Sequence, residues 1–282
     1  MKFKKLSELN MTDDFLFKEV MNDPKTCKEV LECILGREIG RVEVVGTEMD
    51  IKSVYGKRGI RLDVYAKDSS DVMYNVEMQN INHHDIPRRM RYTQAQLDVS
   101  MLSEGIQNYN DLNDSIIIFI CDFDPFGKSK YVYNFVSTEK SDSTLTLDDG
   151  TAKIFISTQG EGEVRKELKD FLSYIKCSTA EEAEKSESLM LKNLNARVAD
   201  IKENRNAEAR YMVYEKLRSE AVAEGHIDGY IEGREAGITE GREACMKNVL
   251  RVVEQYKKGE IGAEQAAEKL GITKEEFLLL GE

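Results

Sequence analysis

Asp63, Glu77 and Gln79 are the residues whose types and spacing suggest chemistry. They lie in "RLDVYAKDSSDVMYNVEMQ", residues 61–79, where two apolar-rich segments flank a polar turn. Side chains alternate between the faces of a strand, so Glu77 and Gln79 are expected on one face, about 7 Å apart. Asp63 lies in the preceding strand, and a hairpin register can bring its carboxylate alongside them.

Two convergent carboxylates repel each other and need a counter-charge. Mg²⁺ takes one or two carboxylates and keeps several waters. Such an ion lowers the pKa of a bound water and neutralises charge on a reacting phosphate. The pattern therefore suits metal-dependent phosphodiester hydrolysis. The alternative is that these charges protect an edge strand, because D-x13-E-x-Q is short enough to arise by chance.

A basic patch follows in "INHHDIPRRMRYTQ", which contains Arg88, Arg89, Arg91 and Tyr92. On the helix predicted there, Arg88, Arg91 and Tyr92 share a face. Guanidinium groups bind phosphates in a bidentate manner, and a tyrosine ring stacks on a base. This patch is therefore a candidate for holding DNA phosphates. The alternative is a solvated helix start whose arginines pair with surface carboxylates.

Several predicted elements position these residues. Residues 12–36 are expected to form two helices that are separated at Pro24 and end at Gly36. Hydrophobic patterning predicts helices over 86–104 and 161–176 and strands over 40–51, 61–68, 73–79, 115–123, 130–137, 144–147 and 152–157. This order indicates a mixed α/β domain over residues 1–176.

The chain changes character after residue 176. Residues 177–245 are expected to contain a long amphipathic helix over 179–220 and a glycine-periodic helical spacer, with glycine at every fourth position: Gly225, Gly229, Gly233, Gly237 and Gly241. The glycine stripe marks either a solvated spacer or a helix that pairs between protomers, which would give a homodimer. Residues 246–282 are expected to form a small helical segment turning at Gly271. Its outline resembles a helix-turn-helix, but few basic residues are present, which favours a helical cap.

Charge and cysteine usage exclude several classes of protein. The net charge is −12, with 24 Lys and Arg against 30 Asp and Glu in residues 1–176, and 16 against 22 in residues 177–282. Neither part is basic, so a nucleic acid must be held by a local patch. The five cysteines form no CxxC pair, which argues against disulfides and zinc and suits a reducing cytosol. The absence of a long apolar run or a signal-peptide pattern predicts a cytoplasmic protein without a membrane span.

Five sequence blocks carry a family resemblance: "MTDDFLFKEVM", "RLDVYAKD", "YNVEMQN", "RRMRYTQAQLD" and "GIQNYNDLNDSIIIFICDFDPFGKSKYVYNF". In this order they resemble the Rpn-type recombination-promoting nucleases, often described as PD-(D/E)XK nuclease family transposases. The similarity covers about residues 6–160. It implies a restriction-endonuclease-like fold, a central mixed sheet flanked by helices, followed here by a long helical C-terminal extension.

The resemblance also implies an activity and a site. Such proteins cut DNA phosphodiesters with a divalent metal. Asp63 and Glu77 would be the metal-binding carboxylates, Asp14 an additional acidic contributor, and the Arg89–Tyr92 helix a support for the site or the scissile phosphate. Gln79 stands where the wider superfamily has lysine, and an amide supplies no positive charge but can orient a water.

The sequence therefore predicts a Mg²⁺-dependent DNA endonuclease, with Mn²⁺ or Ca²⁺ as alternative ions. In this hypothesis Asp63, Glu77 and Gln79 form the catalytic group. The alternative is a catalytically degenerate nuclease fold that binds nucleic acid or assembles through its helical tail. A further option is RNA as the substrate.

Overall fold

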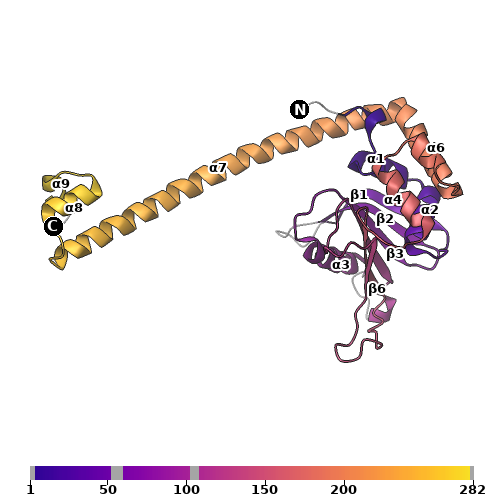
Figure 1. Ribbon diagram of the computed structural model, residues 1–282, viewed down its shortest axis with the longest axis horizontal. Coiled ribbons are helices and arrows are strands. Elements are labelled where there is room, and N and C mark those ends of the chain that lie inside the picture. Colours follow the sequence, from indigo (N-terminus) through magenta and orange to yellow (C-terminus); the bar gives the residue numbers. More distant parts are fainter. Residues whose placement is uncertain (1–3, 52–59, 102–107, 280–282) are drawn as a thin grey trace. The chain divides into compact units, whose positions relative to one another are not determined.

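The computed structural model describes residues 4–51, 60–101 and 108–279. Its centre is a six-stranded sheet in the order β1-β2-β3-β4-β6-β5. The strands are β1 (Val42–Ile51), β2 (Ile60–Asp68), β3 (Met73–Gln79), β4 (Ser115–Cys121), β5 (Val132–Phe135) and β6 (Thr151–Ser157). β3, β4 and β6 are parallel, and the remaining neighbours are antiparallel. The predicted mixed sheet flanked by helices is confirmed (Figure 1).

β2 and β3 form the predicted hairpin, and Asp68 closes its turn. The Asp68 carboxylate accepts hydrogen bonds from the N–H groups of Ser70 and Val72 at 2.8 and 3.1 Å. It also accepts one from the Tyr74 hydroxyl at 2.8 Å. An Asx-type turn of this kind fixes where the two strands begin to pair. The hairpin therefore has a defined register, Val64 opposite Val76.

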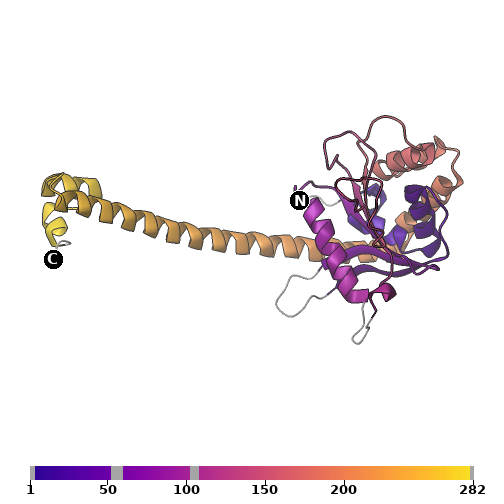
Figure 2. The same cartoon turned by 90° about the horizontal axis from the view of Figure 1, so that it is seen from below.

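The two faces of the sheet are covered differently. One face packs against α1 (Asp14–Met21), α2 (Pro24–Leu35), α4 (Lys166–Lys176) and α6 (Leu189–Glu203), which share its larger core. α3 (Ile86–Met101) covers the other face through Ile86, Met90 and Leu97 (Figure 2). β4, "SIIIFIC", is buried along its whole length, because its side chains point alternately to the two faces of the sheet and helices cover both faces.

The two expected N-terminal helices are present, and α1 begins at Asp14, two residues after the expected start. Asp23 caps α2, and its carboxylate accepts the N–H of Thr26 at 2.8 Å, while Pro24 occupies the first turn. Gly36 ends α2 with a φ of 71°, a left-handed conformation that favours glycine. Arg165 donates to the carbonyl groups of Cys33 and Ile34 at this helix end. The caps thus define both ends of α2.

Three sequence expectations differ from the structure. The helix expected over 161–176 begins at Lys166, and residues 144–147 form no strand but contribute one isolated bridge, Thr138 to Thr146. The single helix expected over 179–220 is divided into α5 (Ala180–Glu184), α6 and α7 (Arg205–Lys257). Ser188 and Asn204 interrupt it, because their side chains cap the helices that follow them. The end of the 86–104 helix lies outside the described residues.

The chain divides into two compact units, Met1–Tyr214 and Glu215–Glu282. In the first unit, the start of α7 belongs to the larger core through Ala207 and Tyr211. In the second unit, α8 (Ala263–Leu270) and α9 (Lys274–Leu279) pack with α7 around Val252 and Phe277. Gly271, with a φ of 69°, turns the chain between α8 and α9 as expected. Among the described helices, none has the length and apolar character that crossing a membrane requires.

Candidate active site

Asp63 lies where the β2–β3 ladder ends. The paired register runs from Lys67 opposite Met73 to Val64 opposite Val76, and Asp63 is the β2 residue next to this last pair. The Asp63 carboxylate Oδ2 accepts the backbone N–H of Met78 at 3.2 Å. The Asp63 side chain therefore accepts a backbone N–H that lies beyond the last pair of the β2–β3 ladder. This contact holds Asp63 beside the end of β3.

Glu77 is at the centre of a ring of hydrogen bonds and is only 1% exposed. Its Oε2 accepts from Arg89 Nη2 at 2.9 Å and from Gln79 Nε2 at 3.2 Å. Arg89 Nη1 also donates to Gln79 Oε1 at 3.0 Å, which closes the ring. The other carboxylate oxygen, Oε1, accepts from Asn75 Nδ2 at 3.2 Å. β3 therefore presents three polar side chains, Asn75, Glu77 and Gln79, toward α3.

Lys18 of α1 brings a second positive charge. Its Nζ lies 3.3 Å from Asp63 Oδ1 and 3.3 Å from Asp14 Oδ2. The Lys18 side chain is 9% exposed, whereas that of Asp14 is 43% exposed. Asp14 thus reaches the site through Lys18, and its carboxylate also accepts from the Tyr214 hydroxyl at 3.3 Å. Gln79 stands where the wider superfamily was expected to have lysine, and here a lysine from another element contacts Asp63.

The local electrostatics show that negative charge at this site is incompletely balanced. The pKa of Glu77 is raised to about 7, because burial and the Asp63 carboxylate raise it by more than Arg89 and Asn75 lower it. Burial also raises the pKa of Asp63, against the opposing effect of Lys18. Glu77 thus experiences the negative charge of Asp63, and Asp63 experiences that of Asp14. A further cation would relieve this repulsion.

The donor set can be compared with what a divalent ion needs. Within residues 4–51, 60–101 and 108–279, no group of three or more His, Cys, Asp or Glu side chains could hold a metal. Asp63 and Glu77 supply two carboxylates, which fits an ion that keeps several of its waters, as Mg²⁺ does. Glu77 Oε1 and both Asp63 oxygens retain lone pairs beyond the bonds described above. The residues therefore fit a hydrated ion of the Mg²⁺ type, not a closed protein cage.

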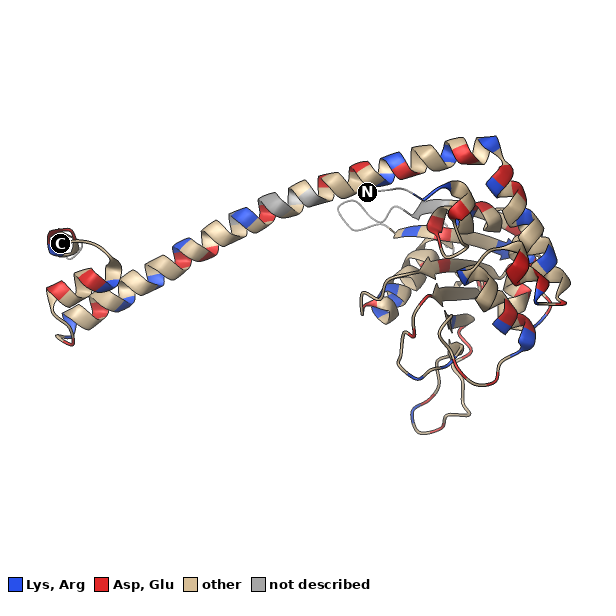
Figure 3. Ribbon diagram, turned by 45° about the horizontal axis from the view of Figure 1, so that its top comes forward, with Lys and Arg blue, Asp and Glu red and all other residues tan. Residues whose placement is uncertain are grey.

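The structure separates the three arginines of α3. Arg89 turns inward to Glu77 and Gln79, and its guanidinium lies 5.9 Å from the centre of the Phe119 ring. Arg88 and Arg91 are exposed, and neither pairs with a carboxylate in the described part of the chain. Tyr92 is 38% exposed beside them. Elsewhere basic and acidic residues are interspersed, as along α7 (Figure 3).

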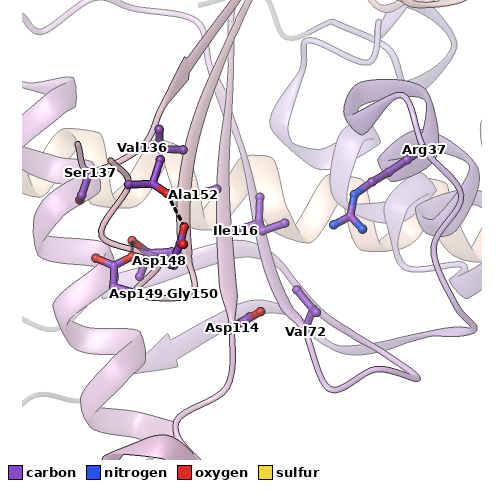
Figure 4. Close-up of a pocket in the computed structure, with 12 residues that line it drawn as sticks. Arg37, Val72, Asp114, Ile116, Val136, Ser137, Asp148, Asp149, Gly150 and Ala152 are labelled. Atoms are coloured by element: carbon purple, nitrogen blue, oxygen red, sulfur yellow. Dashed lines mark hydrogen bonds between the residues drawn. The ribbon is translucent and has the colours of Figure 1, made fainter. Parts of the chain in front are cut away.

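A cavity of about 410 Å³ lies at the opposite end of the sheet from Glu77. Its lining includes Asp114, Asp148 and Asp149, just before the amino ends of β4 and β6, and Arg37, which follows α2 (Figure 4). Asp148 accepts from the Thr146 hydroxyl at 2.7 Å, and Asp149 from the Thr151 hydroxyl at 2.7 Å. These carboxylates are thus engaged in turns. The cavity contains none of the residues that the sequence nominated.

Sequence patterning anticipated part of this arrangement. It nominated Asp63, Glu77, Gln79 and Arg89, which the fold brings together, and it missed Lys18 and Asn75. A signal for Lys18 existed: it is the one basic residue on the helix "DFLFKEVM", four positions after Asp14. Asn75 is 1% exposed, and its Oδ1 accepts no hydrogen bond among the described residues, which marks it as part of the polar site.

Comparison with known proteins identifies one match. The family model described as PD-(D/E)XK nuclease family transposase matches residues 11–224. The matched segment includes α1, the β2–β3 hairpin and α3, which together supply every side chain of the site described above. No curated protein and no solved structure matches the chain.

Proposed function

The chain belongs to the PD-(D/E)XK nuclease family transposases, and from this membership we propose that it is a divalent-metal-dependent DNA endonuclease of the cytoplasm. One observation carries the proposal. Asp63 and Glu77 lie on neighbouring strands at the end of the β2–β3 ladder, where burial and a nearby carboxylate (Asp14 for Asp63, Asp63 for Glu77) disfavour both charges. Such a pair is costly unless a cation uses it.

In this proposal Asp63 and Glu77 hold a Mg²⁺ ion, and Mn²⁺ or Ca²⁺ would occupy the same oxygens. The bound ion would supply an activated water and neutralise charge on the scissile phosphate. Lys18 favours the ionised form of Asp63 and holds its carboxylate in place. Gln79 donates one amide hydrogen to Glu77, and its second is suited to orient a water. Asp14 contributes through its contact with Lys18.

Arg88 and Arg91 are proposed to hold the DNA backbone. Both are exposed on α3 within one turn of Arg89, and arginines bind phosphate oxygens in a bidentate manner. Tyr92 is placed to stack on a base or a sugar. Such a local patch suits a protein with a net charge of −12, because phosphate contacts need positive charge only where the duplex lies.

The test is cleavage of supercoiled plasmid by the purified full chain in Mg²⁺ or Mn²⁺, with EDTA as the blank. Asp63→Asn keeps the size of the side chain and removes a charged ligand, so nicking is expected to fall at least a hundredfold, the scale on which a lost electrostatic contact acts. Asp111→Asn, an exposed substitution of the same kind, is the control. Equal nicking by wild type and Asp63→Asn would refute the proposal. A parallel assay with RNA tests whether RNA is the substrate instead of DNA.

A second function is favoured by a specific observation: Glu77 is already bonded through both of its oxygens, and residue 79 is an amide. In this alternative the fold is a degenerate nuclease that binds nucleic acid or assembles through its tail, with exposed apolar side chains of α7 such as Leu217 and Ile238 pairing in a homodimer. A chain that neither cleaves DNA nor gains thermal stability from Ca²⁺, yet sediments as a dimer, would establish it.

A further inference from the structure

The Arg89 side chain can reach both the buried site and the solvent, which distinguishes it from Arg88 and Arg91. Its guanidinium reaches Glu77, which is 1% exposed, but the Arg89 side chain itself is 42% exposed. Arg88 and Arg91 on the same helix face solvent. A long side chain at the margin of a buried site can leave it by rotation alone. Glu77, on a central strand, cannot follow.

The hydrogen-bond ring defines what Arg89 does in its inward position. Both of its Nη groups are used, one on Glu77 and one on Gln79, and Gln79 in turn donates to the same Glu77 oxygen. A lysine at position 79 would repel Arg89 and compete for Glu77. The amide instead accepts from the guanidinium and orients it. Gln79 is therefore well suited to a site in which arginine is the resting counter-charge.

The charges of the site explain why this arrangement is exchangeable. Asp63 and Glu77 carry two negative charges and Asp14 adds a third beside Lys18, whereas Lys18 and Arg89 carry two positive ones. A divalent cation at the two carboxylates would add two positive charges within a few ångströms of the guanidinium, at low local dielectric. Lys18 is almost fully enclosed, whereas Arg89 has a path to solvent. Repulsion is thus relieved by outward movement of Arg89.

We propose that Arg89 is an exchangeable counter-ion: it neutralises Glu77 until a divalent cation binds, and then turns outward to join Arg88 and Arg91 on a DNA phosphate. This inference rests on the metal site of the proposed function and adds a coupling to it. Metal binding releases a phosphate ligand, so the cation strengthens DNA binding. By linkage, DNA strengthens cation binding by the same factor.

The first experiment measures Ca²⁺ affinity by calorimetry on the full chain without DNA, at pH 8. Arg89→Met removes the competing charge and leaves Glu77 without a counter-ion, so Ca²⁺ is expected to bind about tenfold more tightly than to wild type. Arg91→Met removes an arginine from the same helix without touching Glu77 and is expected to leave the Ca²⁺ affinity unchanged. Arg89→Lys keeps the charge but loses the bidentate geometry of the guanidinium group, so its Ca²⁺ affinity should lie between those of wild type and Arg89→Met.

The second experiment measures binding of a fluorescently labelled DNA duplex in Ca²⁺ and in EDTA. Wild type and Arg91→Met are both expected to gain affinity from Ca²⁺, with Arg91→Met weaker throughout. Arg89→Met is expected to lose most of the gain. Neither measurement depends on cleavage.

The outcomes separate two failures. If wild type binds Ca²⁺ and Arg89→Met binds it equally or more weakly, the exchange is refuted while the metal site stands. If wild type binds no Ca²⁺ at all, the metal-dependent function itself fails. Tighter Ca²⁺ binding by Arg89→Met together with a lost Ca²⁺ effect on DNA supports the exchange.

Discussion

At the scale of single residues, the stability of the site depends on the ion pair between Lys18 and Asp63. Both side chains are nearly enclosed, at 9% and 12% exposure, and Asp63 lies just beyond the last residue pair of the β2–β3 ladder. Removing one member of an enclosed pair leaves a charge without compensation, which costs more than the pair itself contributes. The two residues are therefore expected to be coupled in stability.

The expected result is a strong departure from additivity. Lys18→Met should lower the free energy of unfolding by about 3 kcal/mol, and adding Asp63→Asn should restore most of it. Urea denaturation of wild type, both single variants and the double variant measures the coupling. The same cost for Lys18→Met in both backgrounds would contradict it. Cleavage is expected to stay lost in the double variant, because Asn does not replace the carboxylate.

At this scale the sequence predicted the acidic residues but not their partners. Asp63, Glu77 and Gln79 lie in one hairpin, so a two-residue period was enough to place them together. Lys18 and Arg89 reach them from helices on opposite faces of the sheet. Which helix residue meets which strand residue depends on packing, and no local period encodes it.

At the scale of elements, the loop after β4 is stabilised by one carboxylate. Asp124 accepts the Tyr133 hydroxyl at 2.6 Å and the N–H groups of Phe126 and Ser129 at 3.0 and 2.7 Å. Partial burial acts to raise the pKa of Asp124, but these donors outweigh it and hold the pKa at about 2, below the ordinary value of 3.8. The ionised carboxylate thus links the loop to β5.

This lowered pKa predicts a pH dependence. A group whose pKa is lower in the folded chain stabilises it fully above pH 3.8, and the contribution is lost as pH falls toward 2. Asp124→Asn should therefore lower the Tm at neutral pH, and its difference from wild type should shrink between about pH 4 and pH 2. Thermal unfolding followed by circular dichroism checks this. A constant difference across that range would show that the ionised form is not what stabilises the loop.

The elements themselves were predictable where capping and periodicity agree. Asp23, Pro24 and Gly36 give α2 clear ends, and the sequence located them. The helical breaks at Ser188 and Asn204 were missed because composition favours helix on both sides, and a side chain that caps the next helix decides the break. Residues 144–147 have strand-like alternation, but they find a partner only through one bridge.

At the scale of the whole molecule, the main question is where the first unit ends. Composition predicts a boundary at residue 176, whereas the compact unit extends to Tyr214. Helical residues beyond 176 complete its core, including Leu191, Leu194, Val198 and Ile201. Tyr211 and Tyr214 also pack on Phe15, with ring centres 5.1 and 5.6 Å apart. Contacts therefore favour the later end.

Truncation tests this directly. Residues 1–214 are expected to unfold in one cooperative transition, because they keep the covered face of the sheet. Residues 1–176 would expose the surface that α6 covers and are expected to aggregate or to melt without cooperativity. Size-exclusion chromatography and calorimetry distinguish the two. A cooperative 1–176 fragment would support the boundary drawn from composition.

The hairpin origin of Asp63 and Glu77 has a consequence for the order of folding. The two residues are 14 positions apart, so a local turn brings them together at a small cost in chain entropy. Lys18 is 45 positions from Asp63 and arrives only when α1 docks on the completed sheet. Local contacts form early and distant ones late. The acidic pair is therefore expected to form while still hydrated, and water is removed from Asp63 when α1 docks and from Glu77 when α3 docks.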